Sequence, residues 1–105
     1  MLEQQRDLDG ALEAYRRAHE LGNIHGTLRL GSLLAQRGDV GGALAAYRHA
    51  DQRGNAVGSL NLGRLLADQG DQNGAIAAFR RARERGDREV SQAARAAWMK
   101  LIGGE

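Results

Sequence analysis

Apolar residues recur at helical spacing along the whole chain, in segments of nearly equal length. Glycine stands at positions 22, 38, 54, 70 and 86, every 16 residues, and Asn or Asp follows each of these glycines. Glycine suits the left-handed position that ends a helix, and an Asx side chain can cap the first amides of the next one. The pattern therefore predicts about six helices of about 14 residues each, over residues 8–21, 24–37, 40–53, 56–69, 72–85 and 88–101.

The chain also repeats itself with a period of 32 residues. Shifting the sequence by this period aligns the segments 10–23, 41–55 and 73–87, and it aligns 27–39 with 59–71. A fixed period of this length is typical of helical repeats, in which each unit buries its apolar face against its neighbours. We therefore expect a single repeat domain over residues 1–105.

Large and small residues alternate at one level of the predicted helices. Eight residues after each Asx the chain carries Tyr15, Gly31, Tyr47, Gly63 and Phe79 in turn. A glycine inside a helix costs about 1 kcal/mol relative to alanine, so a gain in packing must offset it. We expect each ring to be part of the core, seated against a glycine on the neighbouring antiparallel helix.

These positions also carry a resemblance to a known family. Leu30-Gly31 followed by Ala43, Tyr47 and Ala50 returns as Leu62-Gly63, Ala75, Phe79 and Ala82, and this pattern resembles the tetratricopeptide repeat. The stretch AYRHADQRGNAVGSLNLG, residues 46–63, is also similar to the Sel-type variant of that superfamily. The resemblance implies an all-α fold, a right-handed α-solenoid of antiparallel helix pairs.

The resemblance further implies a non-catalytic scaffold that binds a protein or peptide partner on a concave face. That face would be lined by the first helix of each pair. The candidate partner-binding groove is His25, Leu28, Arg29, Ser32, Val57, Leu60, Asn61 and Arg64, and the same face carries Gln36, Asp68, Glu89, Gln92 and Ala96. A groove that is part aliphatic and part basic is one interpretation, and solvated arginines are the other.

Self-assembly is an alternative function. The segment 8–21 matches the second helix of a pair, so its partner would be missing or supplied from elsewhere. Ala11, Ala14 and Ala18 would then be partly uncovered, and a homo-oligomer formed through this N-terminal edge would cover them. The missing partner of the first helix indicates either a fragment of a longer repeat array or an edge that another chain covers.

Contact with nucleic acid is a third interpretation. The predicted second helices carry Arg16-Arg17, Arg48-His49 and Arg80-Arg81 at matching positions, with Arg83 and Arg85 close by. Stacked repeats would line these residues up as a basic stripe. Acidic residues share the same helices, and no exposed aromatic residues interleave for base stacking. We therefore predict a solvated, salt-bridged outer face and no nucleic-acid partner.

Composition narrows the remaining function classes. The chain contains no cysteine, and its three histidines lack the paired spacing of metal ligands, so we expect no metal and no cofactor. The glycines stand at the predicted helix ends and do not cluster as in a phosphate-binding loop, so we expect that the chain is not an enzyme. The net charge of +2 is weak evidence for any partner. No apolar run is long enough to cross a membrane, and the predicted setting is cytoplasmic.

Overall fold

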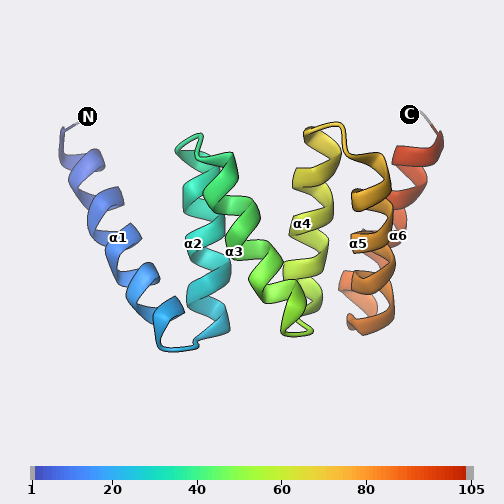
Figure 1. Ribbon diagram of the computed structural model, residues 1–105, viewed down its shortest axis with the longest axis horizontal. Coiled ribbons are helices and arrows are strands. Elements are labelled where there is room, and N and C mark those ends of the chain that lie inside the picture. The colour runs from blue at the N-terminus through green and yellow to red at the C-terminus, as the bar shows by residue number, and fades with distance from the viewer. Residues whose placement is uncertain (1, 104–105) are drawn as a thin grey trace. The chain divides into compact units, whose positions relative to one another are not determined.

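The chain folds into helices joined by short turns. The computed structural model describes residues 2–103, with side chains from residue 8 onward, and no strand occurs within that range. The helices are α1 (Leu2–Glu20), α2 (Ile24–Gln36), α3 (Val40–Gln52), α4 (Ala56–Asp68), α5 (Gln72–Arg85) and α6 (Arg88–Gly103) (Figure 1). The predicted all-α fold is confirmed.

The helix boundaries follow the predicted punctuation except at the two ends of the chain. Helices α2 to α5 begin at the predicted residues and end within one residue of the predicted position. Helix α1 begins at Leu2 instead of residue 8, and α6 continues to Gly103 instead of ending at residue 101. No Gly-Asx pair precedes residue 8, and the residues before it include good helix formers such as Leu2, so nothing in the sequence stops the helix there.

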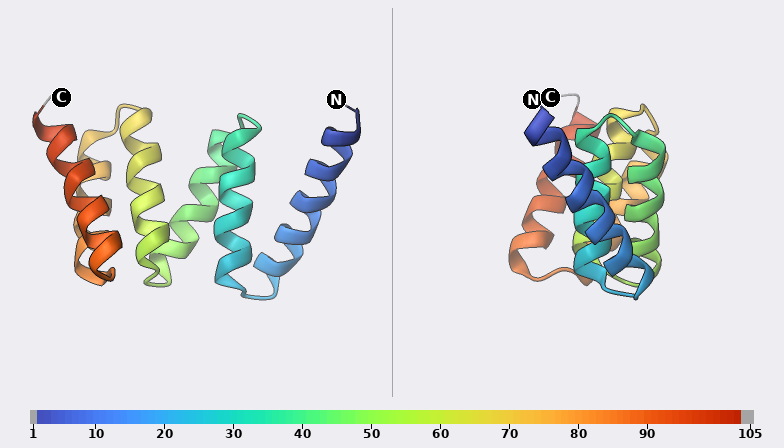
Figure 2. Two further views of the ribbon diagram at one scale, coloured as in Figure 1. Left: turned by 180° about the vertical axis from the view of Figure 1, so that it is seen from behind. Right: turned by 90° about the vertical axis from the view of Figure 1, so that its left-hand side faces the viewer.

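The helices gather into two compact units, Met1–Ala46 and Tyr47–Glu105. In the first unit α1 packs against α2, and in the second α4 packs against α5 while α6 contacts both of them. Figures 1 and 2 show α4, α5 and α6 side by side, with consecutive helices running in opposite directions. Within each unit the helix lengths and the packing of neighbours are those of an α-solenoid repeat.

Each joint between helices uses the predicted Asx cap. A side-chain oxygen accepts a hydrogen bond from the backbone amide three residues later in all five joints. The pairs are Asn23 with Gly26 at 3.2 Å, Asp39 with Gly42 at 2.9 Å, Asn55 with Gly58 at 2.7 Å, Asp71 with Gly74 at 2.9 Å and Asp87 with Val90 at 2.9 Å. Each such cap stabilises its helix by about 1 kcal/mol.

The glycine before each cap behaves as predicted in four joints and differs in the fifth. Gly22, Gly38, Gly54 and Gly70 have φ between 82° and 84°, the left-handed conformation that ends a helix. Gly86 instead has φ −78° and ψ 161°. The residue three places after the cap is glycine in the first four joints and Val90 in the fifth. Because the Val90 side chain already lies against Gly86, the α5–α6 joint takes a different, more extended path.

The second unit contains the predicted pairing of a ring with a glycine. A Cβ placed on Gly63 would lie 2.5 Å from the ring of Phe79, so only glycine leaves room for this side chain. Phe79 is 2% exposed, and Ala75 and Ala78 of the same helix are fully buried. The aromatic position is therefore part of the core at Phe79 and at the buried Tyr47, whereas Tyr15 on α1 is only half-buried.

Candidate functional site

In the first unit, the predicted groove residues lie along α2. His25, Arg29 and Ser32 are exposed, and Leu28 is half-buried. Their spacing of three or four residues places them on neighbouring turns of one helix. The structure therefore leaves these side chains available to a partner, with Leu28 the one apolar member.

In the second unit, the predicted groove residues on α4 separate into different environments. Val57 and Arg64 are exposed and Asn61 is half-buried. Leu60 is 6% exposed and belongs to the core, so it differs from the prediction that it lines an open surface. A leucine at this spacing faces the neighbouring helices in the interior, and burial of its side chain stabilises the unit by about 2 kcal/mol.

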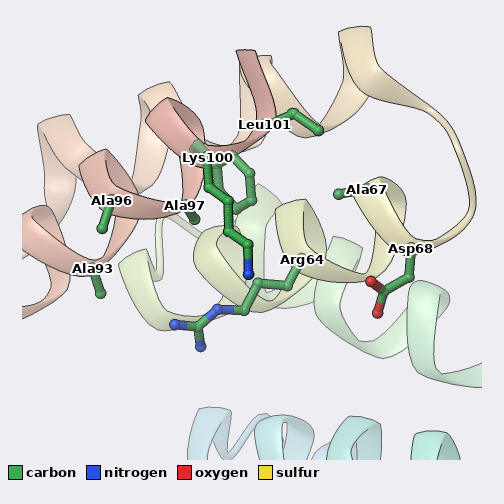
Figure 3. Close-up of a pocket in the computed structure, with 9 residues that line it drawn as sticks. Arg64, Ala67, Asp68, Ala93, Ala96, Ala97, Lys100 and Leu101 are labelled. Atoms are coloured by element: carbon green, nitrogen blue, oxygen red, sulfur yellow. The ribbon is translucent and has the colours of Figure 1, made fainter. Parts of the chain in front are cut away.

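A groove runs between α4 and α6 in the second unit. Its cavity has a volume of about 610 Å³, and we call it the α4/α6 groove. It is lined by Arg64, Ala67, Asp68, Phe79, Ala93, Ala96, Ala97, Lys100 and Leu101. Figure 3 shows the side chains of Arg64 and Lys100 extending to the same side from their two helices, with the alanines of α6 beside them. The groove thus combines an apolar, alanine-rich wall with two cations.

Of the eight residues predicted to form the partner-binding groove, Arg64 is the one that lines the α4/α6 groove. Asp68 and Ala96, which share the predicted face, line it as well, whereas Ala93, Ala97, Lys100 and Leu101 were not predicted. The 32-residue period carries a signal for one of them, because Lys100 occupies the position that Asp68 holds in the preceding repeat. The repeat period therefore indicates the position of Lys100 on this face, but it does not predict the direction of its side chain.

A second polar cluster lies at the α3–α4 joint, and Asp51 is at its centre. Arg81 donates to the Asp51 carboxylate through Nε and Nη2, each at 2.9 Å, and Arg85 Nη1 donates to it at 3.1 Å. Ser59 Oγ donates to Asp51 Oδ1 at 2.6 Å. The Asp51 side chain is 9% exposed while the two guanidinium-bearing side chains are about one third exposed. We call these four residues the Asp51 cluster.

The Asp51 cluster keeps its carboxyl group ionised. Burial alone would raise the pKa of Asp51, because a charged carboxylate is poorly solvated in the interior. The hydrogen bonds from Arg81 and Ser59, together with the positive charges of Arg81 and Arg85, outweigh burial and hold the pKa below its ordinary value of 3.8. The cluster therefore acts as a charged link between α3, α4 and α5.

This cluster accounts for part of the predicted basic stripe. Arg81 and Arg85 are paired with Asp51, and Arg17 lies 3.8 Å from Glu13 on the exposed surface of α1. These pairs agree with the expected salt-bridged outer face. Exposed pairs of this kind contribute between 0 and about 1 kcal/mol, so only the Asp51 cluster, with its buried carboxylate, holds helices together to a larger degree.

Within residues 8–103, His, Cys, Asp and Glu side chains do not gather into a group of three that could hold a metal ion. None of the helices described here has the length and apolar character needed to cross a membrane. His19 Nδ1 lies 2.7 Å from Thr27 Oγ1.

Part of the chain matches a known family of helical repeats. The family model described as Tetratricopeptide repeat matches residues 59–84, which begin inside α4 and end inside α5. The comparison with curated proteins found no match. The matched stretch contains both Gly63 and Phe79, the close contact that the resemblance rested on. Over residues 59–84 the chain is therefore similar to the tetratricopeptide repeat, and its helices fit an α-solenoid of such repeats.

Proposed function

We propose that this chain is a non-catalytic scaffold that binds a peptide segment of a protein partner in the α4/α6 groove. The observation that carries the proposal is the groove itself, a cavity of about 610 Å³ lined by an alanine-rich wall and two cations. The match to the tetratricopeptide repeat supports it, because members of that family generally act as protein-interaction modules. The matched residues 59–84 include Arg64 but end before α6.

The chemistry of the groove favours a partner segment that has both an apolar and an acidic group. Alanine side chains at positions 93, 96 and 97 leave room for a larger apolar side chain from the partner. Burying such a side chain contributes about 25 cal/mol per Å² of apolar surface. Arg64 and Lys100 form no ion pair with any described residue, so both can donate hydrogen bonds to a carboxylate of the partner.

Asp68 tunes this preference. It lies one turn beyond Arg64 on α4 and lines the same groove. A negative charge at this end would repel a second carboxylate placed close to it. The preferred segment would therefore carry its acidic group next to Arg64 and Lys100 and a neutral or basic group near Asp68.

Finer features of the family resemblance remain part of the proposal. The Sel-type character of the joint over residues 46–63 is supported by the close approach of Gly58 to Ala50, where a Cβ on Gly58 would lie 2.5 Å from the alanine methyl. Small residues at such a crossing let two helices approach closely. The cytoplasmic setting and the absence of catalysis stay predictions.

A peptide selection tests the proposed function. Peptides selected from a random display library on the intact chain should bind it, and binding should fall at least tenfold in Ala96→Trp, which fills the groove from an exposed position. Arg64→Glu should weaken the same peptides. The control is Arg48→Glu, an equally exposed arginine on α3 that lies outside the groove. Selected peptides that bind all these variants equally would remove the α4/α6 groove as the site.

A further inference from the structure

A second pocket lies on another face of α6 and takes no part in the α4/α6 groove. Its volume is also about 610 Å³, and we call it the α5/α6 pocket. It is lined by Arg83, Arg88, Ser91, Gln92, Arg95, Trp98, Met99 and Ile102. Three of these side chains are arginines and none is acidic. Met99 and Ile102 are 52% and 56% exposed, so large apolar groups face solvent beside the cations.

The repeat identifies what this pocket corresponds to. Moving back by one period of 32 residues places Arg83 on Asp51, Ser91 on Ser59 and Arg95 on Gly63. Those three earlier positions all contact α5. Asp51 and Ser59 accept hydrogen bonds from its arginines, and Gly63 receives its Phe79 ring. The α5/α6 pocket is therefore the same binding position for a helix, one repeat later.

The charge at this position is reversed. Where Asp51 binds the guanidinium groups of Arg81 and Arg85, the pocket presents Arg83. Ser91 Oγ, freed from any carboxylate, donates instead to the carbonyl oxygen of Arg83 at 2.8 Å. A helix seated here in the same register would place its equivalents of Arg81 and Arg85 against Arg83. Arginines there would be repelled, and carboxylates would form charge-assisted hydrogen bonds.

The seat for an aromatic ring is also changed. Arg95 takes the place of Gly63, so the notch that receives Phe79 is filled. A small residue at that point of the incoming helix would fit under the Arg95 side chain. The positions equivalent to the fully buried Ala75, Ala78 and Ala82 would stay small or apolar, as they are in α5.

We propose that the α5/α6 pocket binds an amphipathic helix of a partner protein that carries carboxylates where α5 carries Arg81 and Arg85. Charge complementarity points away from a second copy of this chain. The helix of this chain that matches the missing second helix is α1. Two periods before Arg81 and Arg85 stand Arg17 of α1 and Leu21, which directly follows α1. Neither residue could pair with Arg83, so a second copy of this chain does not supply the carboxylates, and a partner helix of different sequence does.

Two synthetic peptides of identical composition provide the probe. Both have the sequence of residues 72–87 with Phe79→Ala. The first also carries Arg81→Glu and Arg85→Glu, which puts both carboxylates opposite Arg83. The second carries Arg80→Glu and Arg83→Glu, at positions that are exposed on α5 and do not belong to the Asp51 cluster. Net charge and composition are equal, so only the position of the carboxylates differs.

Binding to the intact chain is measured by fluorescence anisotropy of labelled peptide, with the fluorescence of Trp98, the only tryptophan, as a readout inside the pocket. We expect the first peptide to bind at least tenfold more tightly than the second. Arg83→Glu in the chain should abolish this preference and should instead admit the peptide that keeps Arg81 and Arg85 and carries only Phe79→Ala. Arg48→Glu, outside the pocket, should change neither result.

Several outcomes overturn the proposal. Equal binding of the two peptides would mean that general charge attraction, and not the register, drives association. Binding that survives Arg83→Glu in a chain whose circular dichroism is unchanged would place the site elsewhere. No binding of the first peptide at about 1 mM, a free energy near −4 kcal/mol, would mean that the pocket receives no such helix. A dimer detected by light scattering and dissolved by Arg83→Glu would identify the occupant as a second copy.

Discussion

The α1–α2 joint and the α3–α4 joint lie one repeat apart and share the same backbone design. In each, a glycine with φ 83° ends one helix and an asparagine caps the next. In each, a hydroxyl on the next helix donates to the carbonyl oxygen of that asparagine, Thr27 to Asn23 at 3.2 Å and Ser59 to Asn55 at 3.1 Å. The two joints therefore fix their helices by the same local hydrogen bonds.

The joints also share a close crossing of helices. A Cβ on Gly58 would lie 2.5 Å from the methyl group of Ala50 and 3.2 Å from its backbone carbon. A Cβ on Gly26 would meet Ala18 in the same way. Because backbone atoms are among the contacts, a side chain at either glycine cannot be accommodated by rotating a flexible neighbour.

The chemistry of the two joints differs beyond this shared frame. His19 lies against Thr27 in the first joint, whereas Asp51 lies against Ser59 in the second and adds Arg81 and Arg85. The first polar contact joins two helices, α1 and α2, while the second ties α3 and α4 to α5. The repeat thus specifies how the backbone turns, and one side chain per joint decides which further helix is linked to it.

The largest effect is expected where the two joints are alike. Gly58→Ala and Gly26→Ala should each lower the free energy of unfolding by about 2–3 kcal/mol, because the added methyl group overlaps an alanine of the preceding helix. Urea denaturation followed by circular dichroism and by Trp98 fluorescence measures the change.

Gly10→Ala is the matched control for these substitutions. Gly10 also lies inside a helix, but a Cβ there meets nothing within 4 Å. Alanine should therefore stabilise the helix by about 0.5–1 kcal/mol, through its better helix propensity. A Gly58→Ala variant that is unchanged in stability, or is stabilised as Gly10→Ala is, would contradict the close crossing of α3 and α4.

A smaller effect is expected where the joints differ. Asp51→Ala should lower the free energy of unfolding by about 2 kcal/mol, since it removes the carboxylate that accepts from Arg81, Arg85 and Ser59. The loss stays below that of a fully buried pair because the two arginines are about one third exposed and can be rehydrated. Asp68→Ala, which removes an exposed carboxylate that forms no ion pair with a described residue, should change stability by less than about 0.5 kcal/mol. Equal losses in the two variants would contradict a stabilising Asp51 cluster.

Lowering the pH should weaken the α3–α4 joint, which contains Asp51, without a mutation. The pKa of Asp51 is lowered in the folded state, so its stabilising effect is complete above the unfolded-state value of 3.8 and is lost as the pH falls through the lower folded-state pKa. Urea midpoints measured between pH 2 and 6 should fall below about pH 4, and the fall should be smaller in Asp51→Asn, which cannot ionise. An unchanged acid profile in Asp51→Asn would exclude this carboxyl as the titrating group.

The sequence predicts the backbone features that the two joints share, but it does not predict the Asp51 cluster that distinguishes them. Gly63 against Phe79 and the five Asx caps follow from spacing, because residues 16 or 32 apart fall at equivalent places in successive helices. The Asp51 cluster joins residues 30 and 34 apart, and its contacts depend on how three helices cross and on the rotamers of two long side chains. Such contacts need the packing angle between helices, which a period does not contain.

The α5–α6 joint, which differs from the other four, also differs from them in sequence. Four joints have glycine three residues after the cap, and the fifth has Val90. Val90 in place of that glycine is the difference in sequence at this joint, and the prediction that Gly86 is left-handed is wrong, because its φ is −78°. For the groove, Arg64 was predicted from its position on the first helix, but the burial of Leu60 depends on how closely its neighbours pack around it.

The smallest effect concerns the hydroxyls that both joints share. Ser59→Ala and Thr27→Val should each lower the free energy of unfolding by about 1 kcal/mol, because each hydroxyl is almost fully buried and hydrogen-bonded, that of Thr27 to two partners and that of Ser59 to three. The joints should separate in a double-mutant cycle. Ser59→Ala combined with Asp51→Asn should cost less than the sum of the single losses, since the two side chains share one hydrogen bond at 2.6 Å. Thr27→Val combined with Asp51→Asn should be additive, because these residues belong to different joints, and coupling there as strong as for Ser59 would mean that the two joints do not act independently.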